Sequence, residues 1–240
     1  FYFRLSPSVP PDAATVQAIK SAAAKLASLS GERRQAEFMK ILGLAEVGKA
    51  VNFLAEVGAL ETTLGDESRA GDRAWNLARL SALVTHEKVL PAASDVLLRL
   101  AVLMPDTQTA DEVASSLRLS RRRTQRLRTA LDHPGADLAQ RPQHYLHYNG
   151  APCVSDHAVM ALADGQISAE EAGSVLAMAA EWVEPRFPLR GAEMAAAGMP
   201  EGPAMGRLLA ELEAWWVAQD FPAKRAVEAE FHRRWPSEKN

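Results

Sequence analysis

The chain has 240 residues, 48% hydrophobic and 24% charged, which is enough to bury a sizeable core as one large domain or two small ones. Its net charge of −3 excludes a protein that is basic as a whole, so any nucleic-acid surface must be local. The single Cys153 excludes an internal disulfide and suits a reducing compartment.

No apolar run approaches the roughly 20 residues that a membrane helix needs, and no basic-then-apolar leader is present. We therefore expect a cytoplasmic protein with no membrane contact. The chain opens on Phe1 without a Met, which indicates a fragment or a processed product.

Three helices are predicted near the N-terminus. Asp12 precedes an alanine-rich helix over residues 13–29, and Ser30 is expected to cap the next one. A third helix is predicted over 46–57, with Gly58 as its stop.

The helix that follows Ser30 carries charges at spacings that bring opposite signs together: Glu32, Arg33, Glu37 and Lys40. Taken alone, this pattern is typical of a solvated helix face, because exposed pairs contribute little.

Two more helices are predicted before residue 105. The first covers 72–85, with Trp75 and three leucines available for burial. The second covers 95–104 with Ser94 as its cap, and its sequence LLRLAVLM is too apolar for a surface helix. We expect it to lie at the centre of the fold.

The stretch 109–128 predicts two short helices joined by a turn, with Ser120 as the cap of the second. An Arg-, Thr- and Gln-rich second helix is typical of a DNA-binding helix-turn-helix. Residues 118–128 contain no acidic residue and include six arginines: Arg118, Arg121, Arg122, Arg123, Arg126 and Arg128. The arginines could face phosphates, or they could form a solvated helix face.

Residues 134–150 look less regular. The set formed by His144, His147, Cys153 and His157 does not follow a known zinc spacing, so no metal site is expected. Nearby aromatics could stack on bases or cover the edge of a core. Helices are predicted over 152–163 and 168–184, the latter with a capping box from Ser168 to Glu171.

The last segment predicts a tight helical hairpin, made of a helix over 189–197 that ends at Gly198 and a second helix that begins at Gly202-Pro203. We expect the glycines at 198, 202 and 206 to let another backbone approach the start of the second helix. That end would also suit a phosphate. A final helix runs from Pro222 through Trp235, and no strand is predicted, so the fold class is all-α.

Two blocks carry a family resemblance. One is GERRQAEFMKIL over 31–42. The other is the ordered set Leu189-Arg190-Gly191, Glu193, Gly198, Gly202-Pro203, Gly206, Leu209, Glu213, Trp216 and Phe221-Pro222. Together they resemble class II bacterial tRNA nucleotidyltransferases, the CCA-adding enzymes, and poly(A) polymerases, especially the alphaproteobacterial form.

The resemblance implies neck-like helices over 1–64, a helical body over 65–184 and a tail hairpin over 185–240. In that family these parts hold the acceptor and TΨC arms of a tRNA so that its 3′ end reaches a catalytic head. Nucleotidyl transfer needs paired carboxylates for two Mg²⁺ ions. The family carries them as Asp-x-Asp in a β-sheet head, which this sequence lacks. We therefore expect no catalytic residue here, an N-terminal head upstream, and Mg²⁺ with ATP or CTP only in the full-length enzyme.

The expected RNA contacts in the tail are Arg190, Gly202, Gly206, Arg207, Lys224 and Arg225. A second contact is expected at Arg121, Arg122 and Arg126, and the neck motif comprises Glu32, Arg33, Glu37 and Lys40. Two alternatives stay open, a helix-turn-helix regulator that binds DNA and a helical adaptor that binds no nucleic acid.

Overall fold

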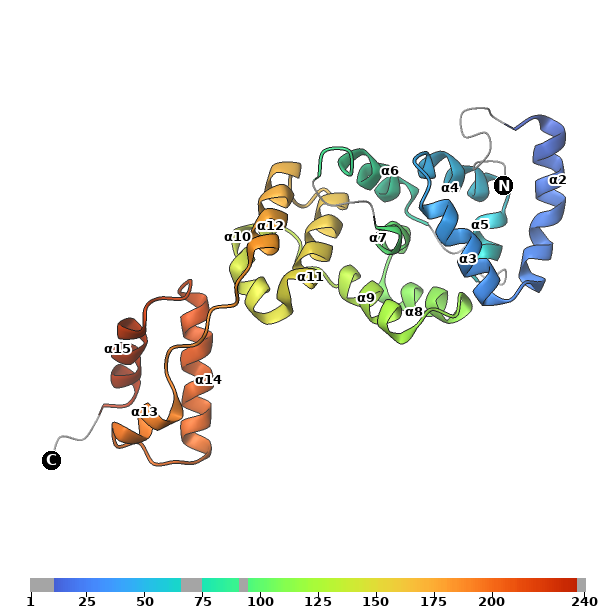
Figure 1. Cartoon of the computed structure of the whole chain (residues 1–240). Helices are drawn as coiled ribbons and strands as arrows, with labels where there is room; N and C mark the ends of the chain where they lie inside the picture. The colour runs from blue at the N-terminus through green and yellow to red at the C-terminus, as the bar shows by residue number, and fades with distance from the viewer. Residues whose placement is uncertain (1–10, 66–74, 91–94, 237–240) are drawn as a thin grey trace.

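The computed structural model describes residues 11–65, 75–90 and 95–236, and every regular element in these ranges is a helix. The all-α prediction is confirmed for this part of the chain. The helices form an elongated molecule, with α2 at one end and α13, α14 and α15 at the other (Figure 1). In the ranges described, no helix combines the length and apolar character needed to cross a bilayer.

Five short elements lie near the N-terminus: α2 (Ala13–Ala23), the 3₁₀ helix η1 (Ala24–Ser28), α3 (Gly31–Leu42), α4 (Val47–Glu56) and α5 (Ala59–Leu64). The predicted caps are confirmed, since Asp12 accepts from the Thr15 amide at 2.7 Å and Ser30 accepts from the Arg33 amide at 3.3 Å. The single helix expected over 13–29 is wrong. The chain tightens into η1 and becomes extended at Leu29, which brings Ser30 into capping geometry.

The middle of the chain forms α6 (Leu77–His86), α7 (Val96–Ala101), α8 (Thr107–Ser116), α9 (Arg121–Leu131), α10 (Asp137–Gln140), α11 (Pro142–Ala163) and α12 (Ala169–Glu181). Residues 97–104 are all buried, which confirms the central position expected for α7. The observed cap of α7 is Asp95, which accepts from the Leu97 amide at 2.7 Å. Ser94, which we expected there, lies outside the described residues.

The expectation of a less regular segment over 134–150 is wrong for most of that range, because residues 137–140 and 142–149 are helical. Pro142 occupies the first turn of α11, where its missing N–H has no helical partner to lose. The chain stays helical until Gly150, whose φ of 76° and ψ of 159° fall in a region that glycine alone adopts readily. Gly150 therefore bends α11 into two halves.

One large apolar core joins α3 to α9 and the second half of α11, and it includes Phe38, Leu100, Leu127 and Met160. This core continues across residue 64, so the N-terminal helices share it with those that follow. We use "body" below for α3 to α12.

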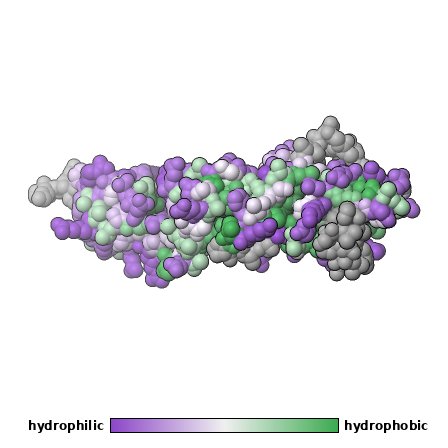
Figure 2. Space-filling model, turned by 90° about the horizontal axis from the view of Figure 1, so that it is seen from above, coloured by the Kyte–Doolittle hydropathy of each residue, from purple (hydrophilic) through white to green (hydrophobic). Residues whose placement is uncertain are grey.

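The C-terminal helices are α13 (Gly191–Ala196), α14 (Pro203–Ala218) and α15 (Lys224–Arg234), and we call these three the tail. They have an apolar core of their own, built on Met194, Met205, Leu212, Trp216 and Phe231. Figure 2 shows hydrophilic residues spread along one face of the molecule, with hydrophobic residues gathered toward its middle more than over the tail.

Aromatic rings join the tail to the body. The imidazole of His147, on the first half of α11, lies 5.9 Å from Trp216 and 5.6 Å from Phe221, measured between ring centroids. Phe221 also lies 6.0 Å from Trp182 at the end of α12, and Trp216 donates its indole N–H to the Pro222 carbonyl at 2.8 Å. The junction is thus a small cluster of edge-to-face rings.

Candidate nucleic-acid interface

The paired helices α8 and α9 fold as the sequence predicted. Asp106 caps α8 through the Thr109 amide at 2.7 Å, and Ser120 caps α9 through the Arg123 amide at 3.4 Å. Leu117 and Leu127 are fully buried and hold the pair on the core. The opposite side of α9 is left for its arginines.

Three of these arginines, Arg121, Arg122 and Arg123, are exposed. Among the described residues none of the three side chains has an ion pair or hydrogen bond. Arg128 differs, because its guanidinium lies 3.4 Å from a carboxylate oxygen of Asp111. The first turn of α9 therefore presents three free positive charges to solvent.

Arg126, which we expected to contact RNA, forms ion pairs with other residues of the protein. Its Nε and Nη2 donate to the two carboxylate oxygens of Asp156 at 2.7 Å each, and Nη2 also lies 2.7 Å from Asp95. The hydrogen bond to Asp156 is the largest cause that raises the pKa of Arg126 above its ordinary value. The side chain thus ties α9 to α11 and to the start of α7. Local sequence could not show this, because Asp95 and Asp156 are about thirty residues away on either side.

The N-terminal helices approach the end of α8 closely at two glycines, Gly31 at the start of α3 and Gly65 after α5. A Cβ added to Gly31 would lie 2.2 Å from the Ser116 carbonyl oxygen, and one added to Gly65 would lie 2.2 Å from the Ser116 hydroxyl. Only glycine permits this close approach of α3 and α5 to the end of α8. Segments 31–42 and 109–128, which the sequence singled out separately, therefore meet in space.

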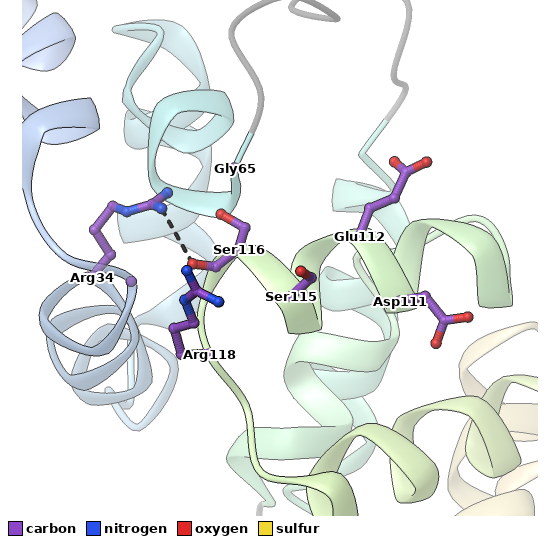
Figure 3. A pocket seen from close by; sticks show the side chains of 8 residues that line it. Arg34, Gly65, Asp111, Glu112, Ser115, Ser116 and Arg118 are labelled. Atoms are coloured by element: carbon purple, nitrogen blue, oxygen red, sulfur yellow. Dashed lines mark hydrogen bonds between the residues drawn. The ribbon is translucent and has the colours of Figure 1, made fainter.

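Arg34 secures this contact and was missed at the sequence level. Its Nη1 donates to the carbonyl oxygens of Thr62 and Thr63 at 3.0 Å. Its Nη2 donates to the Ser116 carbonyl oxygen at 3.2 Å, the bond marked by the dashed line in Figure 3. A cavity of about 630 Å³ lies beside it, with Arg118 on its wall. Its position four residues before the buried Phe38 could have indicated that Arg34 faces inward.

The four residues of the neck motif take different roles. Lys40 and Glu37 form an exposed ion pair at 2.7 Å, and Arg33 is exposed with no ion pair among the described residues. The pKa of Glu32 is lowered, first by a hydrogen bond at its own backbone amide and then by the Ser30 hydroxyl. Its carboxylate therefore sits at the start of α3, where the helix dipole favours negative charge.

In the tail, Gly202 and Gly206 are exposed, and a Cβ added at either, or at Gly198, would meet nothing within 4 Å. The close backbone approach expected at these glycines is wrong. Gly198 and Gly202 instead have positive φ angles of 94° and 154°, a conformation that glycine adopts more readily than other residues. At Gly191 an added Cβ would lie 3.4 Å from the Met205 sulfur of α14, which is an ordinary contact with a side chain.

Glu193 interacts with two residues that we expected to contact RNA, Arg190 and Lys224. It accepts from the Arg190 amide at 2.8 Å and pairs with Lys224. Lys224 is the largest cause that lowers the pKa of Glu193, and Glu193 in turn raises the pKa of Lys224. Arg207 and Arg225 are exposed, without an ion pair among the described residues. Free guanidinium groups are therefore present in the tail as well as on α9.

A groove of about 1050 Å³ runs beside α9. Its lining comes from α3, the start of α7, α9 and α11: Met39, Asp95, Val96, Leu97, Ser120, Arg122, Arg123, Gln125, Arg126, Thr129, Pro152, Cys153, Ser155 and Asp156.

Cys153 and His157, both at this end of α11, are not arranged for nucleophilic catalysis. The Sγ to Nε2 distance is 3.5 Å, but Nε2 also lies 2.9 Å from the Thr129 carbonyl, which can only accept. Nε2 therefore carries the hydrogen and cannot take the thiol proton. Burial also raises the pKa of the Cys153 thiol. Across the described ranges, no three His, Cys, Asp or Glu side chains are grouped so as to hold a metal ion.

Residues 10–64 match a family model described as the probable RNA and SrmB-binding site of polymerase A. No curated protein matches the chain. The segment that packs against the α8–α9 turn thus matches the RNA-binding region of the poly(A) polymerase and CCA-adding enzyme family, and the match covers residues 10–64 alone.

Proposed function

We propose that this chain is the tRNA-binding helical portion of a CCA-adding or poly(A)-adding nucleotidyltransferase. The observation that carries the proposal is the contact at Gly31 and Ser116, where the family-matched segment meets the turn before α9. It supports a common RNA surface, in which the neck region and three free arginines lie on neighbouring elements. In this proposal residues 1–64 act as the neck of the family, residues 65–184 as its helical body and residues 185–240 as its tail, so that the region we call the body, α3 to α12, includes part of the neck.

Recognition of this kind needs no reading of base edges. Structured RNA is held by its outline, through phosphates and 2′-hydroxyl groups, for which unpaired guanidinium groups are suitable partners. Arg121, Arg122 and Arg123 supply such groups on α9, and Arg190, Arg207 and Arg225 supply them in the tail. The RNA 3′ end would then be presented to a catalytic head that these 240 residues do not contain.

The test is tRNA binding measured at rising salt concentration. We expect affinity to fall steeply, and replacing Arg121, Arg122 and Arg123 together by Ala should lower the salt slope by about one unit per lost phosphate contact. Arg141→Ala is the matched control, because that guanidinium is already paired with Asp137 at 2.8 Å. Binding of duplex DNA as tight as tRNA, with a preferred sequence, would instead favour a DNA-binding regulator, and absence of binding to either would favour an adaptor.

A further inference from the structure

The groove beside α9 combines two kinds of surface. We call its apolar lining residues the floor, namely Met39 from α3, Val96 and Leu97 from α7, and Pro152 from α11. Its rim carries Arg122 and Arg123, whose guanidinium groups are free among the described residues. A ligand that fills this groove must therefore be anionic at one edge and flat or apolar at another.

The charges in the groove do not cancel. Arg126 lies 2.7 Å from both Asp95 and Asp156, so one positive charge is shared by two carboxylates. With Arg122 and Arg123 the lining holds three positive and two negative charges, which leaves a net charge of +1. The surplus is positive and sits at the rim, where it complements phosphate.

The apolar floor distinguishes between two forms of RNA. A duplex presents phosphates and sugars outward and keeps its bases stacked inside, so it gains nothing from such a floor. An unpaired nucleotide can place its base there while its phosphate reaches the arginines. The volume of about 1050 Å³ is at the upper end for a small-molecule site, which leaves room for more than one nucleotide.

We propose that this groove binds an unpaired stretch of RNA, with bases on the Met39 and Pro152 floor and phosphates on Arg122 and Arg123. The inference rests on the proposed function in that the chain binds RNA, and it assigns Arg122 and Arg123 to the phosphates of an unpaired stretch of that RNA. Arg126 has a positioning role here. By fixing α9 to α11, it sets the width of the groove.

The native chain contains its own reporter. Cys153 lines the groove and is the single cysteine of the 240 residues. We expect an unstructured oligouridylate of about ten nucleotides to slow alkylation of Cys153 by N-ethylmaleimide at least severalfold, because the bound strand covers the thiol. An RNA duplex of the same length should not slow it.

Variants separate a groove from a diffuse cationic surface. Arg122→Ala and Arg123→Ala should each weaken oligouridylate binding about tenfold and remove the protection of Cys153, since each loses a charge-assisted contact. Arg128→Ala is the matched control, because Arg128 is exposed on the same helix but is paired with Asp111 and does not line the groove. It should keep protection with a much smaller loss of affinity.

The outcomes distinguish this inference from the proposed function. If tRNA binds but oligouridylate leaves the alkylation rate of Cys153 unchanged, the groove proposal is wrong and the proposed function stands. Equal losses for Arg128→Ala, Arg122→Ala and Arg123→Ala would also overturn it. If no RNA binds at all, both fail together.

Discussion

The body and the tail are stabilised by different interactions. In the body, charged side chains are buried together. Arg99 is 5% exposed, lies 2.5 Å from Glu87, and donates to the Leu42 carbonyl at 2.6 Å. In the tail, Trp216 and methionine side chains fill the core, and the ion pair between Lys224 and Glu193 is exposed. Both regions have an apolar core, but the body buries both partners of an ion pair, whereas in the tail the buried Glu230 pairs with the more exposed Arg233 and Arg234.

The largest effect is expected from Arg99→Ala. The change leaves the Glu87 carboxylate and two backbone carbonyls buried without their donor, which should lower the free energy of unfolding by about 3–5 kcal/mol. Urea unfolding followed by circular dichroism would measure it. Arg128→Ala, which breaks the exposed pair with Asp111, should change stability far less. Equal effects would show that burial of the ion pair is unimportant in the body.

Gly31→Ala tests how tightly the body is packed. The added methyl would lie 2.2 Å from the Ser116 carbonyl oxygen, so we expect a loss of about 2–3 kcal/mol as α3 moves away from α8. Gly206→Ala in α14 is the matched control, because its methyl would meet nothing within 4 Å. There alanine should be neutral or stabilise by about 0.5–1 kcal/mol through its higher helix propensity. Similar thermal midpoints for the two variants would contradict the contrast.

Phe221→Ala addresses the junction between the two regions. Phe221 contacts His147 and Trp182 of the body and lies 4.8 Å from Trp216 of the tail. Because this side chain is half-buried, its loss should cost about 1–2 kcal/mol and loosen the tail from the body. Small-angle scattering should show a broader distribution of dimensions, while helix content stays constant. An unchanged scattering profile would mean that other contacts fix the tail.

The smallest expected effect is a pH dependence within α15. Arg233 first, and then Arg234, hold the pKa of Glu230 down to about 2 from its ordinary 4.5. A lowered carboxyl pKa in the folded state adds stability above about pH 4.5, and this stability is lost as the pH falls toward 2. The thermal midpoint of the tail should fall over that window, and Glu230→Gln should flatten the dependence. A midpoint that rises on acidification would contradict it.

Local signals predicted most of the fold. The caps Asp12, Ser30, Ser120 and Ser168 were correct because capping involves residues only two or three apart, and the Ser168 amide donates to Glu171 at 2.7 Å as expected. The helix after Pro142 was missed, because His and Tyr have only modest helix propensity and its stability comes from packing against α12.

The candidate site was less accessible to sequence reasoning. The cluster of arginines on α9 could be seen, but the commitment of Arg126 to Asp156 and Asp95 could not, because long-range ion pairs leave no local pattern. Gly31 was recognised only as part of a motif. Its contact with Ser116 arises from the packing of helices that are far apart in the chain.

The bend at Gly150 divides α11 into two halves with different contacts. The turns before it carry His147 and hold the tail, and the turns after it carry Cys153 and Asp156 and form one wall of the groove. Gly150 therefore connects the half of α11 that contacts the tail with the half that lines the groove, so a rotation at this residue would change the position of the tail relative to the groove. A residue with a side chain at position 150 would restrict this backbone rotation. The position of the tail and the width of the groove would then both be affected.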